Sequence, residues 1–235
     1  MQRLFRTPNM ADKIDRAYAR VGQLSMLYDG MMKNQGVLGR LAMKYFWRLS
    51  DEKYDEFLAQ AFRGIPKDFA GRLLEIPAGT GVLSFPIYER LNSAKITCAD
   101  ISQSMLDAAR RNLEKLRLDN VELVQCDVGA MPFADESFDV LLSLNGFHAF
   151  SDKKAAFEET RRVLKADGIF CGCMYVKGLN DRTDWFVENF CQRYGFFTPP
   201  FETLTTLSER LKQLYDCVEL THVEAFAGFV CRGRL

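Results

Sequence analysis

Short strand-like runs alternate with segments of helical periodicity between residues 72 and 176. The runs RLLEIP, KITCAD, VELVQC, SFDVLLSL and GIFCGCMYV begin at residues 72, 95, 121, 137 and 168. Apolar residues recur at helical spacing between them, over residues 82–91, 102–116 and 153–164. Strand, helix and strand repeated in this order predict a parallel sheet with helices on both faces, and therefore an α/β fold.

The last part of the chain departs from this alternation. Two segments of helical character, 184–194 and 204–214, flank the loop FFTPPF. Two strand-like runs then follow in CVELTHVEAFAGFVCRGRL, with only a short polar join near residues 223–225. This pattern predicts a closing antiparallel hairpin, which brings the number of expected strands to seven.

The first 70 residues read as helices. Apolar residues recur at helical spacing through Ile14, Tyr18 and Val21, and the pattern returns over 38–46 and 51–62. We therefore expect a helical cap or lid at 1–70 and a main domain at 71–235. If the first helices cover a ligand, Tyr18 and Tyr28 are candidates for the substrate pocket, whereas the alternative is simple packing against the main domain.

Composition limits the class of partner. The chain has 31 basic residues (Lys and Arg) and 31 acidic residues (Asp and Glu), so its formal net charge is zero. No overall positive charge favours binding to nucleic acid or to an anionic membrane. A small-molecule partner is expected instead. The oligomeric state is left open.

Seven cysteines, most of them inside apolar segments, suit buried free thiols in a reducing compartment better than a disulfide framework. No signal peptide or membrane span is predicted, so a cytoplasmic location is expected. Cys171 and Cys173 lack a second Cys or His pair at ligand spacing, and no metal site is predicted.

The stretch LLEIPAGTGVLSF places a glycine turn directly between a strand and a helix. Glycines at 79 and 81 allow a ligand to approach the backbone, and the N–H groups of the following helix point into the same space. The first strand-to-helix turn of such a sheet lies where ligands bind. An ordinary tight turn with incidental glycines is the alternative.

Carboxylates end the next two strands. Asp100 lies roughly 20 residues past the turn, a spacing typical of an acid that binds the ribose hydroxyls of an adenosine cofactor. Asp100 or Ser102 could instead cap the next helix. Asp127 ends the third strand and could accept a hydrogen bond from a purine amine, although such a residue is more often a surface loop residue.

With these motifs the sequence resembles the class I S-adenosylmethionine-dependent methyltransferases, in the small-molecule branch called methyltransferase type 11. The resemblance rests on LLEIPAGTG, ADISQSMLDAARRN, VQCDVGAMPFADESFDVLLSLNGFHAF and EETRRVLKADGIF, in the expected order over residues 72–175. It implies a Rossmann-like, seven-stranded, mostly parallel sheet with a C-terminal antiparallel hairpin and an N-terminal helical cap. Pro77 stands where the family usually has glycine, which removes one N–H donor from the turn.

The resemblance also implies roles for individual residues toward S-adenosylmethionine and its product S-adenosylhomocysteine. Near the methionine part it places Glu75, Ala78, Gly79 and Gly81. On the adenosine side it places Asp100 at the ribose, Ser102 and Met105 beside the adenosine, and Asp127 with Val128 at the adenine. Asn145 follows the fourth strand, where related enzymes face the methyl group.

The implied chemistry is in-line methyl transfer to a small-molecule acceptor. Such a site must mainly align the acceptor and exclude water, so a general base is optional. His148 is the candidate base, and Phe147 and His148 are expected at the substrate pocket. A packing histidine is the alternative. The segments expected to shape the acceptor pocket are the first helices and residues 181–205.

Two rival functions remain at the level of sequence. A nicotinamide-dependent oxidoreductase shares the glycine turn and the later acid, but Ser84 occupies the third glycine position of its motif. A protein that binds S-adenosylmethionine without turnover and acts through a partner is the second rival.

Overall fold

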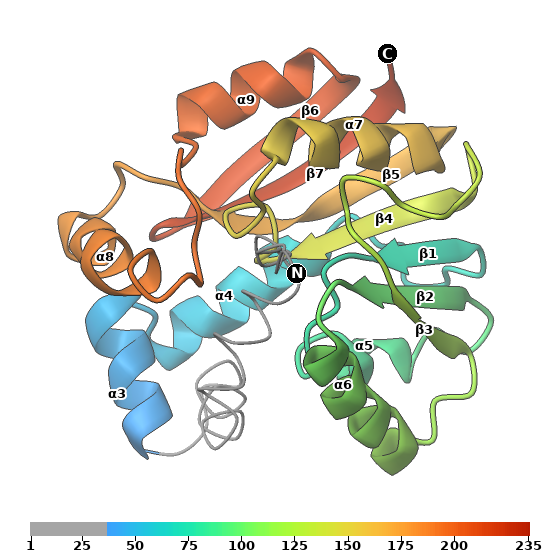
Figure 1. Ribbon diagram of the computed structural model, residues 1–235, viewed down its shortest axis with the longest axis horizontal. Helices are drawn as coiled ribbons and strands as arrows, with labels where there is room; N and C mark the ends of the chain where they lie inside the picture. The colour runs from blue at the N-terminus through green and yellow to red at the C-terminus, as the bar shows by residue number, and fades with distance from the viewer. Residues whose placement is uncertain (1–36) are drawn as a thin grey trace, which may run out of the picture.

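A computed structural model describes residues 37–235 as a seven-stranded sheet with helices on both faces (Figure 1). The strands are β1 Arg72–Glu75, β2 Lys95–Asp100, β3 Val121–Gln125, β4 Phe138–Leu144, β5 Leu164–Tyr175, β6 Tyr215–Val223 and β7 Phe226–Arg234. Their order across the sheet is β3-β2-β1-β4-β5-β7-β6. The first five strands pair in parallel, and β7 runs antiparallel to both β5 and β6. The predicted Rossmann-like sheet and its closing hairpin are therefore confirmed.

The helices cover the two faces of the sheet in separate groups. They are α3 Val37–Phe46, α4 Asp51–Phe62, α5 Phe85–Tyr88, α6 Gln103–Leu116, α7 Lys153–Val163, α8 Asp181–Phe186, the π-helix η1 Val187–Cys191 and α9 Leu204–Lys212. Helices α7 and α9 lie on one face, and α4, α5 and α6 lie on the other (Figure 1). The layers are helix, sheet and helix.

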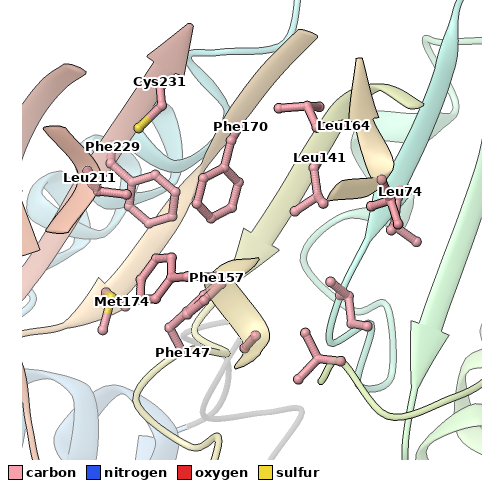
Figure 2. Close-up of a cluster of buried hydrophobic side chains, with 14 of the residues drawn as sticks. Leu74, Leu141, Phe147, Phe157, Leu164, Phe170, Met174, Leu211, Phe229 and Cys231 are labelled. Atoms are coloured by element: carbon pink, nitrogen blue, oxygen red, sulfur yellow. The ribbon is translucent and has the colours of Figure 1, made fainter. Parts of the chain in front are cut away.

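Side chains of β5 alternate between two apolar cores, as expected for a strand that is covered on both faces. Phe170 and Met174 point to the face of α7 and α9, whereas Cys171, Cys173 and Tyr175 point to the opposite face. Figure 2 shows the first core. There Phe147 packs on Phe157 with ring centroids 4.1 Å apart, and Phe170 packs on Phe229 at 4.8 Å.

Polar residues fix where the long helices begin. Ser102 accepts a hydrogen bond from the N–H of Met105, and Asp152 accepts one from Ala155, so these residues cap α6 and α7. Thr203 and Thr206 form a capping box at the start of α9. The sequence boundaries of these helices are correct to within two residues.

Two predicted helices differ in the structure. The predicted helix 82–91 is regular only over α5, because Arg90 and Leu91 bond the carbonyls three residues earlier, as in a 3₁₀ turn. The predicted helix 184–194 begins earlier, at Asp181, where Asn180 caps it, and changes to the π-helix η1. Hydrophobic periodicity does not reveal either change of hydrogen-bond pattern.

Helices α3 and α4 form the described part of the helical N-terminal region. Trp47 and Phe57 pack on Phe226 of β7, with ring centroids 5.1 and 5.0 Å away. Tyr18 and Tyr28, the candidate lid residues, lie outside the described residues. The division into 1–70 and 71–235 stays a prediction.

Candidate active site

A cavity of about 330 Å³ opens at the carboxyl ends of the parallel strands. Glu75 ends β1, Asp100 ends β2 and Leu144 ends β4, and all three line it. This size lies within the range of ligand pockets, roughly 300 to 1,000 Å³. The position, next to β1 where the strand order reverses, is where open α/β sheets bind ligands.

The structure brings most of the predicted cofactor residues to this cavity. Those that line it are Glu75, Ala78, Gly79, Gly81, Asp100, Met105, Asp127, Val128 and Asn145. Ser102 is buried at the start of α6, where it caps the helix and donates its N–H to Asp100 Oδ1. The roles of all these residues toward the cofactor stay predictions.

Asp100 joins the two sequence motifs directly. Its Oδ2 accepts from the N–H of Gly79 at 2.8 Å, and its Oδ1 accepts from the N–H of Ser102 at 2.9 Å. Ser102, not Asp100, caps α6, and the Asp100 carboxylate lies at the cavity wall.

The glycine turn leaves room beside its backbone. Gly79 has φ +54° and Gly81 has φ +69°, a region that favours glycine. A Cβ at Gly79 would meet nothing within 4 Å, whereas a Cβ at Gly81 would come within 2.1 Å of the Phe85 ring. Gly79 therefore provides open space for a ligand, and Gly81 is required by the packing of Phe85.

Glu75 is a buried carboxyl at the inner end of the cavity. It accepts from the hydroxyl of Tyr88 at 2.8 Å and from the thiol of Cys98 at 3.3 Å. Burial raises the pKa of Glu75 to about 7, although these hydrogen bonds act in the opposite direction.

We expect Glu75→Gln to stabilise the free protein at pH 8 and not at pH 4. Because the pKa of the Glu75 carboxyl is higher in the folded than in the unfolded state, the free energy of unfolding of the wild-type protein falls as pH rises from about 4.5 to 7, and it stays lower above pH 7. The gain at pH 8 is on the order of 2 to 3 kcal/mol. Urea unfolding of both proteins at the two pH values measures it. An equal difference at both would contradict the titration.

His148 and Phe147 lie behind the cavity and not on its wall. His148 is buried, its Nδ1 accepts from the N–H of Tyr175 at 3.1 Å, and its ring packs on Phe197 with centroids 3.9 Å apart. Burial, with the nearby charge of Lys153, lowers the pKa of His148 to about 3. Phe147 is fully buried in the core. The role of His148 as a base stays a prediction, and its partner in this structure is a main-chain N–H.

Phe147 and His148, which were expected at the substrate pocket, are not among the residues that line this cavity. Leu83, Phe150 and Phe196 line the cavity together with Gly195. Gly195 and Phe196 come from the segment 181–205 that was expected to shape the acceptor pocket. Phe150 lies two residues after His148, in the segment that follows β4.

The charges around the cavity are of one sign. Among the described residues that line it, four are acids and none is Lys, Arg or His; the acids are Glu75, Asp100, Asp127 and Asp152. This lining favours a cationic ligand and disfavours a pyrophosphate. Within residues 37–235, no group of three or more His, Cys, Asp or Glu residues could hold a metal ion.

Comparison with known proteins places the chain in a family. A methyltransferase-domain model matches residues 73–168. The ubiquinone/menaquinone biosynthesis C-methyltransferase UbiE of Teredinibacter turnerae is 33% identical over 238 residues, which cover 97% of this chain and 89% of that protein. The chain belongs to the class I S-adenosylmethionine-dependent methyltransferases. The cofactor of this family is S-adenosylmethionine, so the nicotinamide reading is set aside.

Other similarities are more local or more distant. The malonyl-[acyl-carrier protein] O-methyltransferase of Geobacter sulfurreducens is 36% identical over 107 residues, covering 46% of this chain and 39% of that relative. In several such matches the chain spans only about two fifths of the relative's length. The structure of a possible histamine N-methyltransferase of Thermotoga maritima has a TM-score of 0.66 at 16% identity, and the match covers 94% of this chain and all of that one. This likeness concerns the fold.

Proposed function

We propose that the protein transfers a methyl group from S-adenosylmethionine to a small, apolar, ring-bearing acceptor of the hydroquinone type. The observation that carries the proposal is the cavity itself. On one side it has the glycine turn, where the N–H of Gly79 binds the Asp100 carboxylate, and on the other it has an apolar wall with Phe150 and Phe196. The relative that matches nearly the whole chain, named a ubiquinone/menaquinone C-methyltransferase, supports the acceptor class.

The residues around the cavity fit the cofactor. The Asp100 carboxylate lies at the cavity wall, where it would accept from a ribose diol, and Asp127 lies at the same wall, where it would accept from an adenine amine. The open space beside Gly79 would admit the methionine part, and the acidic lining suits a cation. When bound, S-adenosylmethionine supplies a methyl group on a positively charged sulfur.

The chain's own contribution is alignment and exclusion of water. Leu83, Phe150 and Phe196 would pack against a flat apolar acceptor and keep water from the reacting carbon. A hydroquinone ring carbon is made nucleophilic by its own hydroxyl groups, so it can attack the methyl group without a protein base. The S–CH3 bond breaks as the C–CH3 bond forms, and the ring carbon then loses its proton to solvent, which restores the aromatic ring. This agrees with a His148 that is neutral and hydrogen-bonded elsewhere.

Two alternatives are weaker. A malonyl carboxylate, the group named for one relative, would be placed among the acidic side chains of the described lining without a cation to pair with it. A protein that binds S-adenosylmethionine without catalysing methyl transfer would have the same cofactor residues. Measuring product formation distinguishes it from an enzyme.

The test is a search for methylated product. We expect the full-length protein, incubated without oxygen with methyl-labelled S-adenosylmethionine and 1,4-naphthohydroquinone, to give a labelled product one methylene heavier. Malonyl-pantetheine is the matched carboxylate acceptor and should give none. Product from the thioester alone would overturn the acceptor class, and cofactor binding without product from either would favour the protein that binds S-adenosylmethionine without catalysing methyl transfer.

A further inference from the structure

Lys153, the first residue of α7, links two loops that form part of the cavity wall. We define the β4 loop as residues 146–152 and the proline loop as residues 192–203. Only 7% of Lys153 is exposed, and its Nζ donates to the carbonyl of Phe150 at 3.0 Å and to that of Thr198 at 2.6 Å. One ammonium group therefore binds one carbonyl in each loop.

Thr198 connects the same two loops from the other side. Its N–H donates to the carbonyl of His148 at 3.0 Å, and its hydroxyl donates to the carbonyl of Ala149 at 2.9 Å. Together with Lys153, these bonds use three consecutive carbonyls of the β4 loop, at His148, Ala149 and Phe150. The spacing of the loops is therefore set by hydrogen bonds at adjacent positions.

Both loops contribute to the cavity. Ala149 and Phe150 of the β4 loop and Gly195 and Phe196 of the proline loop line it, whereas Lys153 and Thr198 do not. The bond between Gly79 and Asp100 lies at the ends of β1 and β2, and none of its atoms takes part in the hydrogen bonds of Lys153 or Thr198. The linked loops thus form the side of the cavity that we assign to the acceptor.

The charge of Lys153 is held by carbonyl oxygens. Among the described residues no carboxylate forms an ion pair with it, because nearby Glu202 is bound by Arg210 and Thr206. Burial lowers the pKa of Lys153 to about 8, and the Glu202 carboxylate opposes that shift. A buried lysine is costly unless its donors are used, and here two of its three donors reach carbonyls.

We propose that Lys153 is a positioning residue for the acceptor: it holds the β4 loop and the proline loop at the one spacing at which Phe150 and Phe196 face the same cavity. Without this link the loops separate, and the acceptor loses its apolar wall while the cofactor side is unchanged. The kinetic part of this inference rests on the proposed function, but the binding and exchange measurements below do not.

The test compares Lys153→Met, which keeps the length of the side chain and removes its donors, with wild type. We expect the Michaelis constant for 1,4-naphthohydroquinone to rise about tenfold, with a smaller change in kcat. The affinity for S-adenosylhomocysteine, measured by calorimetry, should stay within about twofold. Amide exchange at residues 195–198 should become faster. Lys153→Arg, which keeps charge and donors, should restore most of the lost acceptor affinity.

Lys154→Met is the matched control, because Lys154 is exposed and pairs with Glu158 on the surface of α7. It should behave as wild type in every measurement. If Lys153→Met does not fold, Thr198→Val removes the hydroxyl bond to Ala149 from the opposite loop and should give the same pattern more weakly.

Three outcomes would overturn the proposal. The first is a Michaelis constant and loop exchange that are unchanged in both Lys153→Met and Thr198→Val. The second is an equal loss of cofactor and acceptor affinity, which would mean a general structural role. The third is faster exchange throughout the sheet. If wild type gives no product, the proposed function fails, and calorimetry with exchange still decides whether Lys153 links the loops.

Discussion

Asp100→Ala lowers the affinity for S-adenosylhomocysteine by about a hundredfold, or on the order of 3 kcal/mol, if Asp100 binds the ribose. The loss has two parts. The charged acceptor for the diol is removed, and the N–H of Gly79 loses the partner that holds the turn in place. Calorimetry of the purified variant measures the change.

Two further variants separate these parts. Asp100→Asn keeps one acceptor oxygen and should lose less affinity than Asp100→Ala. Asp107→Ala removes an exposed carboxylate of α6 that accepts a hydrogen bond from Gln103, and it should leave the affinity unchanged. An affinity of Asp100→Ala within threefold of wild type, with the fold intact, would show that Asp100 serves only the turn.

The second large effect concerns folding. Gly172 lies in β5 between Ser143 of β4 and Phe229 of β7, with φ +149°. A Cβ there would come within 1.9 Å of the Ser143 carbonyl oxygen, which is backbone and cannot rotate away. We therefore expect Gly172→Ala to lower the free energy of unfolding by more than about 4 kcal/mol, measured by urea unfolding.

Gly178→Ala is the control for backbone strain alone. Gly178 has φ +94°, and a Cβ there would meet nothing within 4 Å. Its cost should be about 1 to 3 kcal/mol, the usual range for a strained backbone position. If Gly172→Ala costs no more than Gly178→Ala, the strands shift to accept the extra carbon and the steric argument fails.

The strands, and the residues that line the cavity beside the glycine turn, could be predicted because their signals are local. Strands such as KITCAD are continuous apolar runs with an acid at the end, and Asp100 is where that pattern puts it. The contact between Asp100 and Gly79, 21 residues apart, follows from two parallel strands whose carboxyl ends meet. Sequence spacing therefore indicated the geometry of this half of the site.

The acceptor half could not be predicted in the same way. Phe196 lies in a loop without periodicity, and its place on the cavity wall depends on the bonds of Thr198 and Lys153. A lone histidine in a sequence looks the same whether it faces a ligand or, like His148, accepts a main-chain hydrogen bond in a dry interior. Burial, which decides between these roles, is a property of the assembled fold.

The order of the strands has a consequence for how copies of this chain can meet. Strands β3 and β6 end the described sheet at its two sides, and each therefore has one row of main-chain groups without a neighbouring strand. Exposed acids stand on both: Glu122 on β3, and Asp216 and Glu219 on β6. A strand added at either edge would have to place its backbone beside these carboxylates, which opposes fibre-like growth. Association of copies through these two edges is thus disfavoured.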